Sequence, residues 1–313
     1  MIRFIGRRLL VLVPTVFVVS TFAFILVQLV PGDPAAYILG NTATTAKVHA
    51  LDAQLGLNRP VLDQYFSWLG GVLHGNFGVS FITNVPVTST LSIALQPTVS
   101  LAILATIVML VAGIAIGMIA AIRGGALDTA LQALASFFMA IPGFWLAALL
   151  IYAFAFKLRW FPATGYTYFN QSPEQWITGL ILPVAAVAGA FTAQVALQAR
   201  SSVLDVISRD FVRTLQAAGI PRHRILLKHV LRNAAIPVAT VAGLNFIFML
   251  SGIVVIEVLF NIPGMGSLMV NAVSQHDLPV LQGAVIYFSI VVVVVSLAAD
   301  LLTGWLDPRI RTR

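Results

Sequence analysis

The sequence predicts an all-α integral membrane protein with six transmembrane helices and both termini in the cytoplasm. Three observations lead to this prediction. Hydrophobic residues make up 59% of the 313 residues and charged residues only 9%, whereas soluble domains hold about 25% charged residues. Six apolar stretches are long enough to cross a bilayer. Lysine and arginine are also distributed unevenly between the segments that join these stretches.

A transmembrane helix needs about 20 mainly apolar residues. The stretches that meet this requirement are approximately 9–30, 99–122, 129–156, 178–197, 238–260 and 281–306. The third and fourth contain Pro142 and Pro183, which bundled membrane helices tolerate because neighbours satisfy the freed backbone groups. The first exceeds the core of a signal peptide, about 7–15 residues, so we interpret it as a retained span.

The basic residues set the orientation, because cytoplasmic loops of membrane proteins are enriched in lysine and arginine. With the N-terminus inside, only Lys47, Arg59, Lys157 and Arg159 lie outside. The other 14 of the 18 lie inside: Arg3, Arg7, Arg8, Arg123, Arg200, Arg209, Arg213, Arg222, Arg224, Lys228, Arg232, Arg309, Arg311 and Arg313. The net charge of +7 therefore reflects topology and not nucleic-acid binding.

Two of the connections are long. The outer one, 31–98, opens with the turn "PGDP", and its stretch "VLDQYFSWLGGVL" places Leu62, Tyr65, Phe66, Leu69, Val72 and Leu73 on one helical face. We therefore expect a folded external cap. The resulting organisation is a tail and first helix at 1–30, an extracytoplasmic cap at 31–94, five helices at 95–306 with an inner loop at 198–235, and a cytoplasmic tail at 307–313.

Several kinds of site are missing from the sequence. The chain has no cysteine, no phosphate-binding G-x-x-x-x-G-K-[ST] loop, no H-E-x-x-H and no G-x-S-x-G. Its five histidines are scattered, and no two are placed as neighbouring ligands on one membrane helix. We therefore expect no metal, no bound cofactor and no catalytic residue in this chain.

The inner segment "RTLQAAGIPRHRILLKHVLRNAAIP", 213–237, is unusually basic. Upstream of Gly219, apolar residues recur at helical spacing at Leu204, Ile207, Phe211 and Leu215. Gly219 ends this helix, Pro221 is well placed to start another, and Ile225, Leu226, Val230 and Leu231 continue the apolar stripe. The segment could lie on anionic lipid, serve only to orient the chain, or insert a short helix into a groove on a soluble partner.

Few polar residues interrupt the spans. Glu257, near the outer end of the fifth, and Asp300, near the inner end of the sixth, are the only acids, and charges inside a span are candidates for function. Small residues recur every fourth position as Gly113, Gly117 and Ala121 in the second span and as Ala185, Gly189 and Ala193 in the fourth. Such rows allow two helices to approach closely.

Several stretches taken together resemble one family. They are "VPGDP", "LGLNRPVLDQYFSWLGGVLHGNFG", "AIPGFWLAALL", "LRWFPATG", "DFVRTLQAAGIPRHRILLKHVLRNAAIPVAT", "EVLFNIPGMGSL" and "DLLTGWLDPRIR". In this order they are similar to the integral-membrane permease subunit of bacterial ABC importers, in the dipeptide, oligopeptide and nickel branch. The resemblance covers essentially the whole chain. It implies a type I ABC importer permease fold in the bacterial cytoplasmic membrane.

The resemblance also implies a role for the basic segment, as the EAA-type coupling helix that docks into a groove on a separate ATPase. The residues concerned are Arg213, Thr214, Leu215, Ala217, Ala218, Gly219, Pro221, Arg222 and Arg224. Arg213 stands at the Glu position of the motif, and Pro237 lies 18 residues beyond Gly219. Both features are typical of the peptide branch. Leu215 and Ala218 depart from it, since the branch usually has Ala and Lys there.

The partners that the resemblance implies are a sister permease, two ATPase subunits that bind ATP and Mg²⁺, and an extracytoplasmic solute-binding protein. Solute would pass between the two permeases, and the pathway or gate candidates are Asn245, Ser251, Glu257, Pro263 and Gly264. Asn245 and Ser251 could equally form interhelical hydrogen bonds. Di- and oligopeptides are the favoured solutes, and nickel, glutathione or oligosaccharide are alternatives. A stand-alone secondary carrier or channel is a rival, and a membrane enzyme a more distant one.

Overall fold

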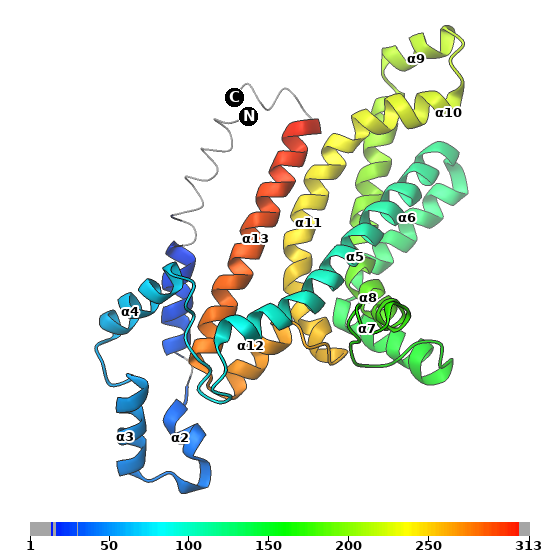
Figure 1. Cartoon of the computed structure of the whole chain (residues 1–313). Helices are drawn as coiled ribbons and strands as arrows, with labels where there is room; N and C mark the ends of the chain where they lie inside the picture. The colour runs from blue at the N-terminus through cyan, green and yellow to red at the C-terminus, as the bar shows by residue number, and fades with distance from the viewer. Residues whose placement is uncertain (1–13, 15–16, 30, 307–313) are drawn as a thin grey trace. The chain divides into compact units, whose positions relative to one another are not determined.

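The computed structural model describes residue 14 and residues 17–29 and 31–306 of the chain, and within these ranges the protein is mostly helical. The start of the predicted first span, both chain ends and the side chain of Asp300 lie outside what it describes. After a helix at Phe17–Gln28, the elements are α2 (Pro34–Leu39), η1 (Gly40–Thr42), α3 (Thr45–Leu55), α4 (Val61–Leu73), α5 (Val87–Arg123), α6 (Gly125–Ala140), α7 (Gly143–Leu150), η2 (Ile151–Lys157), α8 (Pro173–Ile207), α9 (Asp210–Ala217), α10 (Arg222–Arg224), η3 (Ile225–Val230), α11 (Leu231–Leu259), α12 (Met265–Ser274) and α13 (Leu278–Leu306) (Figure 1).

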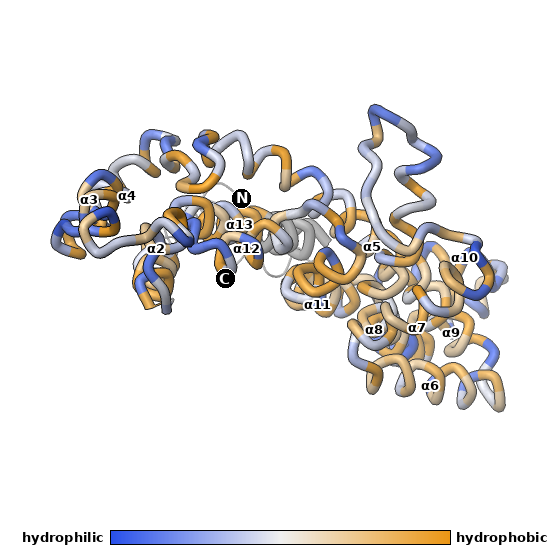
Figure 2. The backbone as a smooth tube through the Cα atoms, turned by 90° about the horizontal axis from the view of Figure 1, so that it is seen from below, coloured by the Kyte–Doolittle hydropathy of each residue, from blue (hydrophilic) through white to orange (hydrophobic). Residues whose placement is uncertain are grey.

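Three described helices are long and apolar enough to cross a membrane: Val87–Arg123, Pro173–Ile207 and Arg222–Leu259. A fourth span results if the bent pair Gly125–Ala140 and Gly143–Lys157 counts as one. In Figure 2 hydrophobic residues dominate α5, α8 and α11, whereas hydrophilic residues gather on α3 and around α10. The described part of the chain is therefore a helical protein with three or four apolar spans.

The predicted third span, 129–156, is not one straight helix. The chain turns by 101° between α6 and α7. Ile141 is extended (φ −81°, ψ 125°), because a proline disfavours helical geometry in the residue before it. Pro183 lies inside the continuous helix α8, so only one of the two span prolines is accommodated within a helix as we expected.

The chain divides into two compact units. One comprises the chain up to Thr98 together with Pro263–Val293, and the other comprises Val99–Ile262 together with the chain from Val294.

In the second unit, α5 packs closely on α8 through the predicted row of small residues. A Cβ atom on Gly113 would lie 2.7 Å from Cγ1 of Val195, and one on Gly117 would overlap the carbonyl oxygen of Ala196. In α8, Gly189 belongs to a different contact, because its Cβ would lie 2.8 Å from Leu146 of α7. Each glycine therefore permits a close approach between helices.

In the first unit, the helix Phe17–Gln28 packs on α4. The Phe24 and Tyr65 rings lie edge to face with centroids 5.2 Å apart, and the hydroxyls of Thr21 and Tyr65 share a hydrogen bond of 2.8 Å. The predicted apolar face of α4 is only partly buried: Tyr65 is buried, but Leu62 and Phe66 are exposed. The helix itself agrees with the prediction, but the face that it buries is narrower.

The corner between α12 and α13 holds two segments of the first unit together. Asp277 is buried and accepts hydrogen bonds from the Ser80 hydroxyl at 2.5 Å and from the backbone N–H of Phe81 at 3.1 Å. The ring of His276 donates from Nε2 to the carbonyl of Pro31 at 3.0 Å. The "PGDP" turn and the 79–86 loop are therefore both fixed to this corner.

Candidate functional site

The predicted bend at Gly219 is present, and its backbone has a well-defined cap. Gly219 has φ +73°, and the N–H groups of Gly219 and Ile220 donate to the carbonyls of Gln216 (3.0 Å) and Leu215 (3.2 Å). This is the Schellman pattern, in which a residue in the left-handed region follows the last helical turn. The chain then restarts at Pro221, whose carbonyl accepts from Arg224 N–H at 2.9 Å. We call α9, this turn and α10 together the docking bend, residues 210–224.

An apolar cluster anchors the docking bend to the rest of the second unit. Val212, Ile225 and Val230 are buried together with Val203 and Val206 at the end of α8. Leu215, Ile220 and Leu226 are partly buried against the same cluster. Since the bend and its anchor share one core, we expect the bend to move together with the end of α8.

The apolar stripe that we predicted upstream of Gly219 is partly wrong. Leu204 and Phe211 are exposed, and the neighbouring Val212 is buried instead of Phe211. For Phe211 the reason is a break that carries no glycine or proline: α8 ends at Ile207, and Arg209 is extended (φ −74°, ψ 147°) before α9 begins at Asp210. This break changes which residues of α9 face the core. No local sequence pattern predicts it.

The outer face of the docking bend is exposed and basic. Arg213, Arg222 and Arg224 are all exposed. Arg213 lies 3.9 Å from Asp210 in a loose ion pair, whereas Arg222 and Arg224 form no ion pair with any residue that the structure describes. The guanidinium groups can therefore meet acidic groups of another molecule.

Every residue predicted for coupling lies in the docking bend, and most are exposed. Thr214, Ala217, Ala218, Gly219 and Pro221 are exposed together with the three arginines, and Leu215 is half-buried. Sequence reasoning missed Val212 and Ile220 as anchor residues. The two residues are eight positions apart, which is close to two helical turns and is the one sequence signal that could have indicated that both face the core. The turn at Gly219 lies between them, however.

The docking bend continues directly into a long helix. Residues Arg222–Leu259 run through α10, the π-helical η3 and α11, and Pro237 lies inside this helix. In Figure 1, α9 and α10 lie at one end of α8 and α11. A displacement of the bend would therefore act directly on α11.

Close to that end, an ion pair joins α6 to α8. The Arg200 guanidinium donates from Nε and Nη2 to the two carboxylate oxygens of Asp128, both at 2.5 Å. Because both oxygens are engaged, the pair is bidentate and fixes the orientation of both side chains. The sequence did not reveal this partner for Arg200, since 72 residues separate the two.

The pathway candidates do not form one group. On α11, Asn245 and Glu257 are buried, whereas Ser251 is exposed. The Asn245 side-chain nitrogen makes no hydrogen bond with the residues that the structure describes. Pro263 is exposed and Gly264 buried, and both belong to the other unit. The described residues also contain no group of three or more His, Cys, Asp or Glu side chains that could hold a metal ion.

Two family models match the chain. The model described as "Binding-protein-dependent transport system inner membrane component" matches residues 113–312. A second, for the N-terminal part of such membrane components, matches residues 1–102. Together they account for nearly the whole sequence.

Full-length relatives agree with these models. The chain is 40% identical to a "probable peptide ABC transporter permease protein" of Sinorhizobium fredii, over 98% of this chain and 99% of that one. It is 36% identical to the glutathione transport system permease protein of Escherichia coli, over 99% of both chains. Among solved structures, a chain of the MetNI methionine ABC transporter in inward-facing conformations has a TM-score of 0.57 at 15% identity, over 69% of this chain and 96% of that chain. That likeness concerns the fold alone.

Proposed function

The chain belongs to the family of binding-protein-dependent transport system inner membrane components, and we propose that it forms half of the membrane pathway of an ATP-driven importer for small peptides. It is a multi-pass protein of the cytoplasmic membrane and a transport subunit, not an enzyme. The family implies ATPase and binding-protein partners. The observation that carries the proposal is the docking bend, which presents exposed arginines on a rigidly capped turn.

The proposed complex contains this chain, a sister permease, two ATPases and an extracytoplasmic solute-binding protein. ATP and Mg²⁺ bind to the ATPases and not to this chain. Peptide is the proposed solute because the relative with 40% identity carries "peptide" in its name. Glutathione, itself a small peptide, is the second candidate because of the relative with 36% identity.

The proposed topology has six spans, with both termini in the cytoplasm. Residues 31–94 then form the outer cap that receives the binding protein, 95–306 form the transmembrane domain, and the docking bend faces the cytoplasm within the inner loop 198–235. The distribution of basic residues supports this arrangement, because cytoplasmic loops are enriched in lysine and arginine and the arrangement places Arg200, Arg213, Arg222 and Lys228 on the cytoplasmic side.

The proposed coupling runs from the ATPases through the docking bend into α11. Closing of two ATPases around ATP displaces the bend, and the shared apolar anchor carries that displacement to α8 and α11. Asn245, Ser251 and Glu257 on α11, with Pro263 and Gly264 after it, remain the proposed pathway or gate residues. Glu257 is the strongest of these because it is a fully buried ionisable side chain.

The test is to tag the chain, extract it in mild detergent and identify the copurifying proteins by mass spectrometry. We expect two ATPases and a second permease, and the binding protein encoded with them then allows solutes to be screened. A chain that purifies alone and transports in vesicles without ATP would overturn the proposal in favour of a stand-alone carrier. Copurification from the variant Arg222→Glu, which reverses a docking charge, should recover less ATPase than the wild type.

A further inference from the structure

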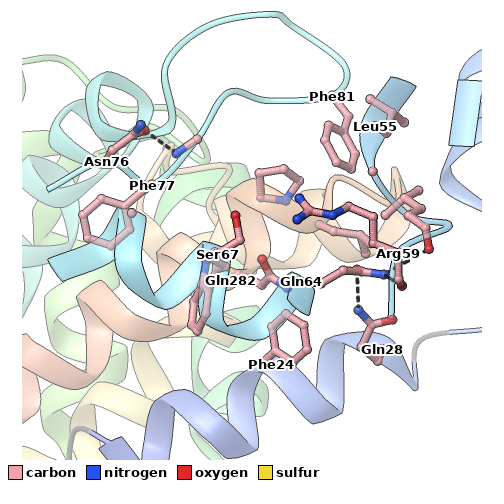
Figure 3. Close-up of a pocket in the computed structure, with 17 residues that line it drawn as sticks. Phe24, Gln28, Leu55, Arg59, Gln64, Ser67, Asn76, Phe77, Phe81 and Gln282 are labelled. Atoms are coloured by element: carbon pink, nitrogen blue, oxygen red, sulfur yellow. Dashed lines mark hydrogen bonds between the residues drawn. The ribbon is translucent and has the colours of Figure 1, made fainter. Parts of the chain in front are cut away.

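The first unit contains a cavity of about 270 Å³. It lies between the helix Phe17–Gln28, α4, the turn after α3 and the start of α13 (Figure 3). Among the residues that line it, Arg59 is the only charged one. Phe24, Leu55, Phe77 and Phe81 supply apolar wall. A cavity with one positive charge and apolar walls suits an anionic group attached to an apolar body.

Some polar side chains of the cavity make no hydrogen bond with the residues that the structure describes. Gln282 is 7% exposed, and its side chain makes no hydrogen bond with the described residues, as is also true of the Ser67 hydroxyl. In Figure 3 the Arg59 side chain reaches into the cavity from one side, and Gln282 and Ser67 lie on the other. The indole N–H of Trp68, which also lines the cavity, is buried and makes no hydrogen bond with the described residues. A buried donor without a partner costs free energy, so the cavity favours a ligand that accepts a hydrogen bond.

Arg59 is positioned by its own turn. Gly56 ends α3 in the left-handed region at φ +75°. Gln64 donates from Nε2 to the carbonyls of Leu57 (3.0 Å) and Arg59 (2.8 Å). Gln28 in turn donates to Oε1 of Gln64 at 3.3 Å. The arginine therefore extends from a fixed backbone, which reduces the entropy lost when it binds an anion.

A second cavity of about 220 Å³ adjoins the first, since Gln28, Leu57 and Leu278 line both. Its charged residues are of the opposite sign, Asp33 and Asp52. One oxygen of Asp33 accepts from the N–H groups of Ala35 and Ala36, whereas the Asp52 carboxylate makes no hydrogen bond with the described residues. The neighbouring cavities thus offer a positive and a negative end.

We propose that these cavities bind a short zwitterionic peptide, with its terminal carboxylate at Arg59, Gln282 and Ser67 and its ammonium group at Asp33 and Asp52. This inference deepens the proposed function and rests on it, because it assigns the peptide a binding place between the proposed outer cap, the helix Phe17–Gln28 and the start of α13. A carboxylate on a partner protein would satisfy Arg59 but not the acidic cavity. Two adjoining cavities of opposite charge therefore favour the solute over a partner side chain.

The test is calorimetric titration of the full-length chain in lipid nanodiscs with the dipeptide Ala-Phe. Its C-terminal amide should bind about tenfold more weakly or worse, because amidation removes the charge that Arg59 recognises. Arg59→Gln should weaken Ala-Phe binding by a similar factor, and Arg59→Lys by less, since lysine keeps the charge but loses the planar fork. Lys47→Gln, which removes an exposed charge of the same unit outside the cavity, is the matched control.

The acidic cavity is tested in the same way. Asp52→Asn should weaken the binding of Ala-Phe but leave that of N-acetyl-Ala-Phe unchanged, with Asp63→Asn on α4 as the matched control. Equal binding of Ala-Phe and its amide, or wild-type binding by Arg59→Gln, would overturn the inference. Propionate binding as tightly as Ala-Phe would overturn the zwitterion assignment, because propionate has no ammonium group.

The proposed function and this inference can be disproved independently of each other. If Arg59→Gln leaves Ala-Phe binding unchanged while the assembled transporter still imports peptide with ATP, the cavity assignment alone is wrong. If no ATPase copurifies with the wild-type chain, the importer proposal is wrong, whatever the titrations give. Circular dichroism and size-exclusion profiles of each variant establish that it is folded before its affinity is compared.

Discussion

Gly219 adopts a backbone conformation that few residues accept. Its φ of +73° lies in the left-handed region, while a Cβ atom at this position would meet nothing within 4 Å. A side chain is therefore opposed by backbone strain and not by a clash. For most residues that strain costs roughly 1–2 kcal/mol, whereas asparagine visits the left-handed region more readily.

We predict that Gly219→Val separates ATP hydrolysis from uptake and that Gly219→Asn does so much less. A local cost of one to two kcal/mol lowers the equilibrium ratio of the bent conformation to its alternatives by a factor of roughly 5–30. Both variants should insert into the membrane at wild-type levels. The measurement is ATPase activity and peptide uptake in vesicles that contain the assembled complex. Wild-type uptake by Gly219→Val would contradict a coupling role for the bend.

Single residues also show what could be predicted at this scale. Gly219 and Pro221 marked the bend correctly because their conformational preferences are local. Pro142 and Pro183 could not be told apart from sequence, since a proline inside a membrane helix is tolerated only if neighbours satisfy the freed carbonyl. That depends on the fold. The pair between Arg200 and Asp128 was hidden for the same reason.

The helices α5 and α8 are in close contact at Gly117 of α5, which has no side chain. A Cβ on Gly117 would overlap the Ala196 carbonyl oxygen and lie 2.7 Å from Cβ of Ala199. The Ala196 carbonyl oxygen belongs to the backbone of α8, which cannot move aside for an added methyl group as a flexible side chain can. The contact is therefore sensitive to a single methyl group.

We predict that Gly117→Ala lowers the thermal unfolding temperature in detergent, because overpacking costs typically about 1–3 kcal/mol. Gly252→Ala in α11 is the matched control. Its Cβ would meet nothing within 4 Å, so the gain in helix propensity, roughly 0.5–1 kcal/mol, should hold or raise the unfolding temperature. Equal effects of the two substitutions would show that the α5–α8 contact is looser than described.

The helices themselves were more predictable than the faces they bury. The periodicity of "VLDQYFSWLGGVL" predicted α4 correctly, yet Leu62 and Phe66 are exposed. The helix Phe17–Gln28 covers only part of α4, and the sequence of α4 does not indicate how much of its apolar face that helix buries. The stripe failed at Phe211, which follows the break at Arg209, because no glycine or proline marks that break.

For the whole molecule, the absence of cysteine makes the proposed topology directly testable. Ala53 on α3 and Gln216 on α9 are both exposed, and the proposal places them on opposite sides of the membrane. A single cysteine at Ala53 should react with a membrane-impermeant maleimide in intact spheroplasts. One at Gln216 should react only after permeabilisation, and the cysteine-free parent should not react at all. The reverse pattern would invert the proposed orientation.

At this scale the sequence predicted the membrane protein class and family well, because composition and motif order extend over the whole chain. It could not predict the two adjoining cavities. Their residues come from the helix Phe17–Gln28, the turn after α3, α4 and α13, and only the fold brings Arg59 near Gln282. A sequence places the two more than 200 residues apart.

The continuous helix Arg222–Leu259 has a mechanical consequence. Its 38 residues give a rod about 57 Å long at 1.5 Å per residue, whereas the hydrocarbon core of a bilayer is about 30 Å thick. Nearly half of the rod therefore extends beyond the core. If it pivots close to α10, a tilt of about 5° displaces its far end at Leu259 by about 5 Å at this length. A small push on α10 is thus amplified geometrically, and no rearrangement within the helix is needed.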